Sequence, residues 1–225
     1  TRSIAVTGVQ TCALPILLEY SSLITDSGFV EVILPTNIAF SKGQRCIHPI
    51  SQGAMGYAIP AIVGTWFASK LPVICVVGDG SIMMNLQELE TIKYHKIPVK
   101  IFVVNNNVYG IIRRRQTDIF RGRTIGTDPS NGVSCPDFKK IAHLFDFQYK
   151  KIEDPNILDD EIKEVITSPS TILCEIMGRE DQSYIEVSST KNANNKIVRR
   201  PLEDQFPFLD RNLFLREMII QPIDQ

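Results

Sequence analysis

Two apolar runs of the sequence end in residues that could bind a metal ion and a phosphate. The run at 73–77 leads directly into a Gly-Asp-Gly-Ser segment that contains Asp79, and the run at 101–104 leads into three asparagines, of which Asn106 is the middle one. Short continuous apolar runs are typical of parallel strands that are buried on both faces. If the two strands are neighbours, Asp79 and Asn106 meet at the sheet edge where ligands bind in open parallel sheets.

These residue types suit a hard cation with an anion beside it. A carboxylate and an amide oxygen, with a backbone carbonyl nearby, favour Mg²⁺ or Ca²⁺ over zinc. Gly78 and Gly80 flank Asp79 and let the backbone approach a ligand closely. Ser81 opens a helix whose free N–H groups favour an anion. The segment therefore predicts a metal-bound phosphate or diphosphate.

The pattern around these runs predicts one α/β domain. Apolar residues at helical spacing between the two runs indicate a strand, helix, strand unit. Further elements are expected as helices at about 56–69, 137–145 and 157–166, and as strands near 148–152 and 171–176. This alternation is typical of a doubly wound parallel sheet flanked by helices.

Three segments are expected to lie outside the sheet and its helices. The stretch 111–136 contains Gly122, Gly126, Pro129 and Gly132, which predicts a long loop that is either functional or disordered. Residues 178–225 are expected to form a C-terminal arm that wraps the domain. The segment 1–16 makes a poor signal peptide and is expected to be extraneous or disordered. The domain itself is therefore predicted to span 17–177.

Composition excludes several classes of protein. The 24 basic and 25 acidic residues leave a net charge of -1, with no electrostatic footprint for nucleic acid or an anionic membrane. Apolar runs are too short to span a membrane. The five cysteines include no C-x-x-C pair, which argues against a zinc site or a disulfide framework and favours a cytoplasmic setting.

The Gly-Asp-Gly-Ser segment, with Asn106 placed 27 residues after Asp79, resembles the thiamine diphosphate motif. A second segment, QGAMGYAIPA at 52–61, is similar to the G-x-M-G-[FY]-x-x-P-A segment of the acetolactate synthase-like family. The resemblance covers about 25–177. It implies the thiamine diphosphate-binding fold, and within it the C-terminal domain that binds the diphosphate.

The resemblance also implies roles for individual residues. Gly53 would contact the aminopyrimidine through its backbone, and Met55 would hold the cofactor in a bent shape. Packing in the core is the alternative for Met55. The two remaining sets are the Mg²⁺ ligands Asp79, Asn106 and the carbonyl of Val108, and the diphosphate-binding residues Gly78, Gly80 and Ser81.

The sequence departs from the family in two places. The loop at 25–30 lacks the family's Gln-His pair, and Arg113 and Arg115 lie near the place of an aromatic residue that helps to select the second keto acid. The arginines could clamp a carboxylate or phosphate of the substrate. Alternatively, they form a solvated basic surface. His48 and Glu88 are predicted to be structural.

Taken as a whole, the resemblance implies the diphosphate-binding half of a thiamine diphosphate- and Mg²⁺-dependent 2-oxo acid decarboxylase or carboligase, a transferase of acetolactate synthase-like type. A pyrimidine-binding domain of the same or another chain would supply the activating glutamate, in a homodimer or homotetramer. Two alternatives stay open: a subunit of a split sulfopyruvate or phosphonopyruvate decarboxylase, and a non-catalytic metal or nucleotide-binding module. The lack of a G-x-G-x-x-G segment after a strand counts against the module.

Overall fold

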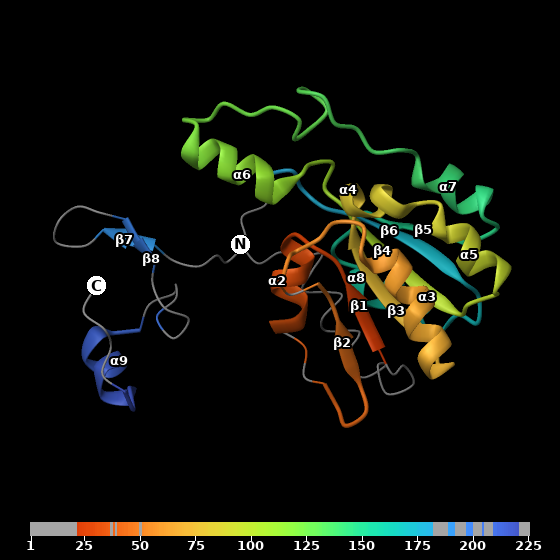
Figure 1. Ribbon diagram of the computed structural model, residues 1–225, viewed down its shortest axis with the longest axis horizontal. Helices are drawn as coiled ribbons and strands as arrows, with labels where there is room; N and C mark the ends of the chain where they lie inside the picture. The colour runs from red at the N-terminus through yellow and green to blue at the C-terminus, as the bar shows by residue number, and fades with distance from the viewer. Residues whose placement is uncertain are drawn as a thin grey trace. The chain divides into compact units, whose positions relative to one another are not determined.

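The chain divides into two units, residues 1–182 and 183–225, each described by itself. The structure is a computed structural model that describes residues 22–36, 38, 40–49, 51–181, 189–191, 197–199, 204 and 209–220 (Figure 1). The segment 1–16, expected to be extraneous, lies outside the described residues. So does most of the expected C-terminal arm.

A six-stranded sheet forms the centre of the first unit, in the order β2-β1-β3-β4-β6-β5. Every neighbouring pair is parallel, which confirms the predicted α/β fold with a parallel sheet. The strands are β1 (Ser22–Thr25), β2 (Arg45–Ile47), β3 (Val73–Gly78), β4 (Val99–Asn105), β5 (Gln148–Ile152) and β6 (Ile172–Met177).

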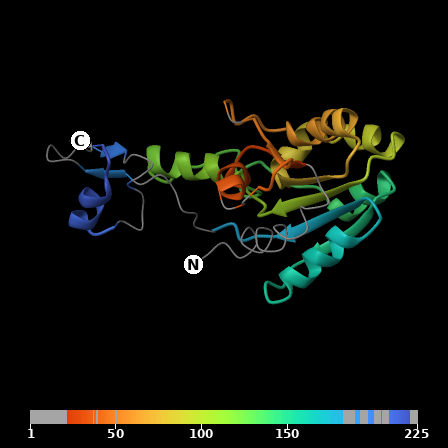
Figure 2. The same cartoon turned by 90° about the horizontal axis from the view of Figure 1, so that it is seen from below.

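Helices cover both faces of this sheet. The helices are α2 (Phe29–Thr36), α3 (Ala58–Ser69), α4 (Asp79–Ile82), α5 (Glu88–Tyr94), α6 (Gly110–Ile119), α7 (Phe138–Leu144) and α8 (Leu158–Thr167), with a short 3₁₀ helix at Met83–Asn85. Buried side chains of α3, α5 and α7 belong to one apolar cluster, and those of α2 and α8 belong to a second. Figure 2 shows α8 on one side of the sheet and α3 with α5 on the other.

The packing of β3 explains why its sequence is a continuous apolar run. Ile74 and Val76 pack in the cluster of α2 and α8, whereas Val73, Cys75 and Val77 pack in the cluster of α3, α5 and α7. Successive side chains of a strand point to opposite faces. Because both faces are covered, every position from Val73 to Val77 is apolar and buried.

The predicted loop at 111–136 is wrong in its first part, because α6 occupies Gly110–Ile119. None of the residues of α6 is buried, so the helix has no apolar stripe that could signal it in the sequence. The glycines and the proline that suggested a loop all come after Ile119. The segment after α6 is irregular, as expected.

The second unit contains a two-stranded antiparallel sheet and a helix in its described residues. Strands β7 (Ser189–Lys191) and β8 (Ile197–Arg199) pair, and α9 spans Arg211–Glu217. Asp210 caps this helix by accepting hydrogen bonds from two backbone N–H groups of its first turn. Across the described parts of both units, no helix is long and apolar enough to cross a membrane.

Phe102 tests the packing of the sheet against α2 and α8. Its side chain is fully buried in that cluster. Phe102→Ala should lower the free energy of unfolding by about 3–5 kcal/mol, because it removes apolar contacts and leaves a cavity. Leu144→Ala on the exposed face of α7 is the control, since Leu144 is 66% exposed. Chemical denaturation that gives equal losses for the two variants would contradict this packing.

Candidate functional site

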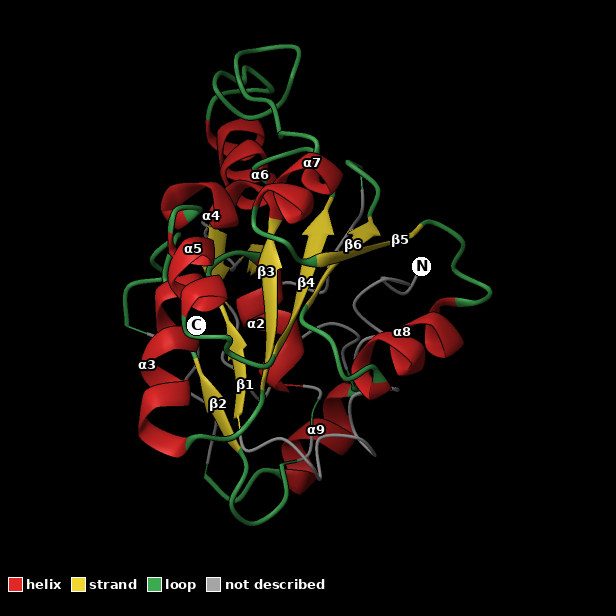
Figure 3. Cartoon of the chain, turned by 90° about the vertical axis from the view of Figure 1, so that its right-hand side faces the viewer, coloured by secondary structure: helices red, strands yellow, loops and turns green. Residues whose placement is uncertain are grey.

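The carboxyl ends of neighbouring strands gather the candidate site residues at one edge of the sheet (Figure 3). The chain leaves β1 toward α2 on one face of the sheet, and it leaves β3 toward α5 on the other face. The connections therefore diverge between β1 and β3, which is where open α/β sheets bind their ligands. Asp26 follows β1 and Asp79 follows β3 at this point.

Asp79 joins the end of β3 to the turn after β4. Its side chain is buried, its Oδ1 accepts from the N–H of Gly80 at 2.8 Å, and its Oδ2 accepts from the N–H of Asn107 at 2.7 Å. The pKa of Asp79 is raised above its usual value, because burial disfavours the charged carboxylate. Hydrogen bonds from backbone N–H groups, including that of Asn106, and from the Cys135 thiol oppose this rise. The structure thus brings Asp79 and the Asn106 turn together.

The turn after β4 presents the other expected metal ligands. Asn107 adopts a left-handed conformation with φ of 55°, which asparagine tolerates better than most residues. The N–H of Val108 donates to Oδ1 of Asn106 at 3.4 Å, and Val108 is buried. One hydrogen bond therefore links the side chain of Asn106 to the backbone of Val108, so both expected oxygen donors belong to one compact turn.

The close approach of Tyr109 explains the glycine at position 80. A Cβ added to Gly80 would lie 1.9 Å from Cε1 of Tyr109, far inside any real contact distance. The N–H of Tyr109 in turn donates to the carbonyl of Thr127 at 2.8 Å. Gly80 therefore allows the Tyr109 ring to lie against the start of α4.

Ser81 connects the segment 52–61 to α4 through a hydrogen bond. Its Oγ accepts from the N–H of Gly56 at 2.8 Å, and Asn85 donates through Nδ2 to the carbonyl of Gly56 at 2.7 Å. The segment that contains Gly53 and Met55 is thereby held beside the start of α4, where Asp79 lies. Met55 is 37% exposed, so its side chain is not packed in the core. The hydroxyl hydrogen of Ser81 can still donate to an anion.

Asp26 follows β1 beside the candidate site and is a residue that the sequence reasoning missed. It is fully buried, and its carboxylate accepts from the N–H of Ser27 at 2.5 Å and from the N–H of Ala58, the first residue of α3, at 2.9 Å. The sequence signal for Asp26 is weak, because the four residues before it include a serine and a threonine, unlike the apolar run at 73–77 that precedes Asp79.

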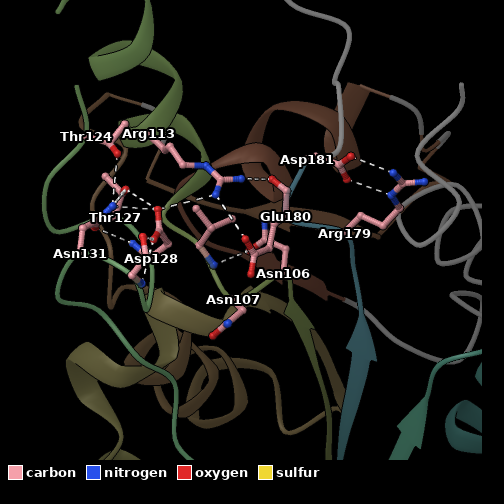
Figure 4. A network of polar contacts seen from close by, with 12 residues as sticks. Asn106, Asn107, Arg113, Thr124, Thr127, Asp128, Asn131, Arg179, Glu180 and Asp181 are labelled. Atoms are coloured by element: carbon pink, nitrogen blue, oxygen red, sulfur yellow. Dashed lines mark hydrogen bonds and ion pairs between the residues drawn. The ribbon is translucent and has the colours of Figure 1, made fainter. Parts of the chain in front are cut away.

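Arg113 forms ion pairs within the first unit (Figure 4). Its Nη1 lies 3.7 Å from a carboxylate oxygen of Asp128 and 3.4 Å from one of Glu180, and its Nη2 donates to the carbonyl of Glu180. The Ser130 hydroxyl donates to Asp128 and lowers the pKa of that carboxyl. Arg113 therefore ties α6 to neighbouring segments, whereas Arg115 is exposed on the helix.

Glu88 and His48 lie in α5 and after β2. Glu88 lies in the first turn of α5, and its Oε2 accepts from the hydroxyl of Thr91 at 2.9 Å. His48 is half-buried in the segment after β2. The contact of Glu88 with Thr91 lies within α5.

The oxygen donors fit a magnesium ion. No cluster of three or more His, Cys, Asp or Glu side chains suited to a metal occurs in the part of the chain that the structure describes. One carboxylate, one amide and one backbone carbonyl make no such cluster. They leave coordination positions for phosphate oxygens and water, which is the usual arrangement for Mg²⁺. Asp79, Asn106 and Val108 are therefore suited to hold a metal-bound diphosphate.

The fold and site define an α/β domain suited to a metal-bound diphosphate at the carboxyl ends of parallel strands. Residues 26–176 match the family described as thiamine pyrophosphate enzyme, C-terminal TPP binding domain. The chain belongs to this family. It therefore contains a thiamine pyrophosphate-binding domain.

Several similar proteins are named as acetolactate synthase large subunits. The protein of Parasynechococcus marenigrum is 31% identical over 150 residues, which is 66% of this chain and 24% of the relative. The isozyme 3 large subunit of Escherichia coli is 33% identical over 143 residues, 63% of this chain and 24% of the relative. The Haemophilus influenzae subunit is 28% identical over 183 residues, 80% of this chain and 31% of the relative. The chain spans about a quarter of the length of such relatives.

Gly80→Ala tests the close contact with Tyr109. The new methyl group would overlap the Tyr109 ring, so the start of α4 or the ring must shift. We expect a loss of about 1–3 kcal/mol of stability, as for other overpacked sites. Gly64→Ala in α3 is the matched control, because nothing lies within 4 Å of its added Cβ.

The control should instead gain about 0.5–1 kcal/mol, since alanine is favoured over glycine within a helix. Thermal unfolding of both variants measures the contrast. A stabilised Gly80→Ala protein would show that Tyr109 does not lie against α4.

Proposed function

We propose that this chain binds the diphosphate end of thiamine diphosphate through Mg²⁺. It would thereby form the diphosphate-binding half of a 2-oxo acid decarboxylase or carboligase of acetolactate synthase-like type. The hydrogen bond from the N–H of Asn107 to the Asp79 carboxylate carries the proposal. It holds the oxygen atoms of a hard donor set together at the carboxyl ends of two adjacent strands. Membership of the thiamine pyrophosphate enzyme family supports the choice of cofactor.

Each site residue has a defined part in this proposal. Asp79, Asn106 and the carbonyl of Val108 would hold the metal ion. Thiamine diphosphate, when bound, supplies an electron sink for bonds next to a carbonyl group. The residues assigned to its binding are Gly78, Gly80 and Ser81 at the diphosphate and Gly53 and Met55 at the remainder of the molecule.

The names of the relatives support the reaction class. The name acetolactate synthase large subunit supports our choice of a small 2-oxo acid as substrate and of a carboligase reaction. It gives no support to a split sulfopyruvate or phosphonopyruvate decarboxylase or to a non-catalytic module. Arg115, which is exposed on α6, is the better placed of the two arginines to meet an anionic substrate group, because Arg113 is engaged in ion pairs.

The proposal extends to partners and setting. A pyrimidine-binding domain of the same or another chain would hold the other end of the cofactor, in a homodimer or homotetramer. A cytoplasmic location is consistent with free Cys46, Cys75, Cys135 and Cys174.

Asp79→Asn and Asn106→Ala should each abolish Mg²⁺-dependent binding of thiamine diphosphate while the protein stays folded. Each change removes or weakens one oxygen ligand of an ion that demands near-ideal octahedral geometry. Calorimetric titration with and without Mg²⁺ measures the loss. Asp118→Asn on the exposed part of α6 is the control and should bind as the unchanged protein does. Unchanged affinity in both site variants would refute the proposed metal ligands.

The 225-residue chain by itself should bind the cofactor weakly and leave pyruvate consumption at the rate of free cofactor in buffer. The proposed site holds one end of the cofactor, and turnover needs both ends positioned. Adding a separately expressed pyrimidine-binding domain from the same gene should restore some turnover. Consumption above the cofactor-only control in the chain alone would show that Glu88 or His48 takes part in proton transfer.

A further inference from the structure

Glu175 is a buried carboxylate that the proposed cofactor site does not use. It lies on β6 and is 7% exposed. Its Oε1 accepts from Nδ2 of Asn105 at 2.6 Å, and its Oε2 accepts from the hydroxyl of Tyr149 on β5. A buried carboxylate is strongly unfavourable unless hydrogen bonds satisfy it. Two short hydrogen bonds to one side chain on each neighbouring strand meet this need.

The hydrogen bonds continue from Glu175 to the expected metal site. Oδ1 of Asn105 accepts from the N–H of Asn107 at 3.0 Å, and the same N–H donates to Oδ2 of Asp79 at 2.7 Å. The connected residues span the adjacent strands β5, β6 and β4 and reach the end of β3. A continuous hydrogen-bonded path therefore links Tyr149 to the carboxylate of Asp79.

Strand register explains why these side chains meet. Glu175 lies opposite Val103 on β4 and opposite Lys151 on β5. Asn105 and Tyr149 are each two positions away from those partners, so they lie on the same face as Glu175 at diagonal positions. Figure 3 shows β3, β4, β6 and β5 in this order across the sheet. The path is therefore a consequence of the parallel pairing.

The chemistry of Glu175 fixes the orientation of the Asn105 amide. A carboxylate only accepts hydrogen bonds, so it selects the NH₂ group of Asn105 and leaves Oδ1 to face the N–H of Asn107. Burial and the bond to Glu175 raise the pKa of Tyr149, so its hydroxyl stays a donor. An amide at position 175 could both donate and accept, and the preference of Asn105 for one orientation would weaken.

We propose that Glu175 is a positioning residue for the metal-binding turn: through Asn105 it holds the N–H of Asn107 in place, so that the turn with Asn106 and Val108 is formed before Mg²⁺ arrives. This inference rests on the proposed function. Residues beyond the direct ligands orient a metal site, and their loss typically lowers metal affinity about 10–100-fold.

Glu175→Gln tests the proposal at nearly constant shape. In the 225-residue chain with thiamine diphosphate present, calorimetric titration should show Mg²⁺ affinity lowered about 10-fold. Amide hydrogen exchange of metal-free protein should show faster exchange at Asn107. Tyr149→Phe should give a smaller change in the same direction, because Glu175 then loses one donor. Because phenylalanine is nearly isosteric with tyrosine, Tyr149→Phe can be measured in its place if Glu175→Gln does not fold.

Two controls separate positioning from general stability. Glu164→Gln removes an exposed carboxylate that pairs with Lys150, and Ile162→Val trims a buried side chain of α8. Both should keep the Mg²⁺ affinity and the Asn107 exchange rate of the unchanged protein, although Ile162→Val lowers the unfolding temperature. Equal losses of affinity in Glu175→Gln and Ile162→Val would overturn the proposal.

The two readouts distinguish failure of this inference from failure of the proposed function. If the unchanged protein binds Mg²⁺ with thiamine diphosphate and Glu175→Gln binds equally well with unchanged Asn107 exchange, the positioning role is overturned and the function stands. If the unchanged protein does not bind, the proposed function falls and the assignment of Glu175 to a metal site falls with it. Amide exchange would then report only on the turn.

Discussion

The hydrogen bond from the N–H of Asn107 to the carboxylate of Asp79 is the contact on which the site depends. It joins the end of β3 to the left-handed turn after β4. Without it, the carboxylate and the amide expected to bind Mg²⁺ would belong to two independent loops. Parallel pairing of β3 with β4 places these loops side by side, and the bond sets their relative position.

Other contacts support this junction from separate segments of the chain. The Tyr109 ring lies against Gly80, and the hydroxyl of Ser81 holds the N–H of Gly56. On the far side of β3, Asp26 connects the end of β1 to the first turn of α3. Glu175 acts from within the sheet through Asn105. Because these contacts come from separate strands and helices, loss of the fold would remove the site, whereas loss of one contact should loosen only part of it.

The sequence predicted the two central strands of the sheet and the polar residues that follow them, because both have strong local signals. The strands at 73–77 and 101–104 are continuous apolar runs followed at once by polar residues. Strand β1 has four residues, and two of them are a serine and a threonine, so tertiary pairing rather than composition defines it. Helix α6 has no buried stripe and left no periodic signal. The role of Arg113 depends on Asp128 and Glu180, which lie far from it in sequence, so only the structure could show it.

Paramagnetic relaxation tests the central claim most directly. Mn²⁺ can replace Mg²⁺ at a hard-oxygen site, and it broadens NMR signals of nearby nuclei. With thiamine diphosphate present, the account predicts selective broadening of the amide signals of Gly80, Ser81, Asn106 and Val108, with Asp79→Asn abolishing the effect. Broadening centred on another part of the chain, or unchanged broadening in the Asp79→Asn protein, would contradict the account.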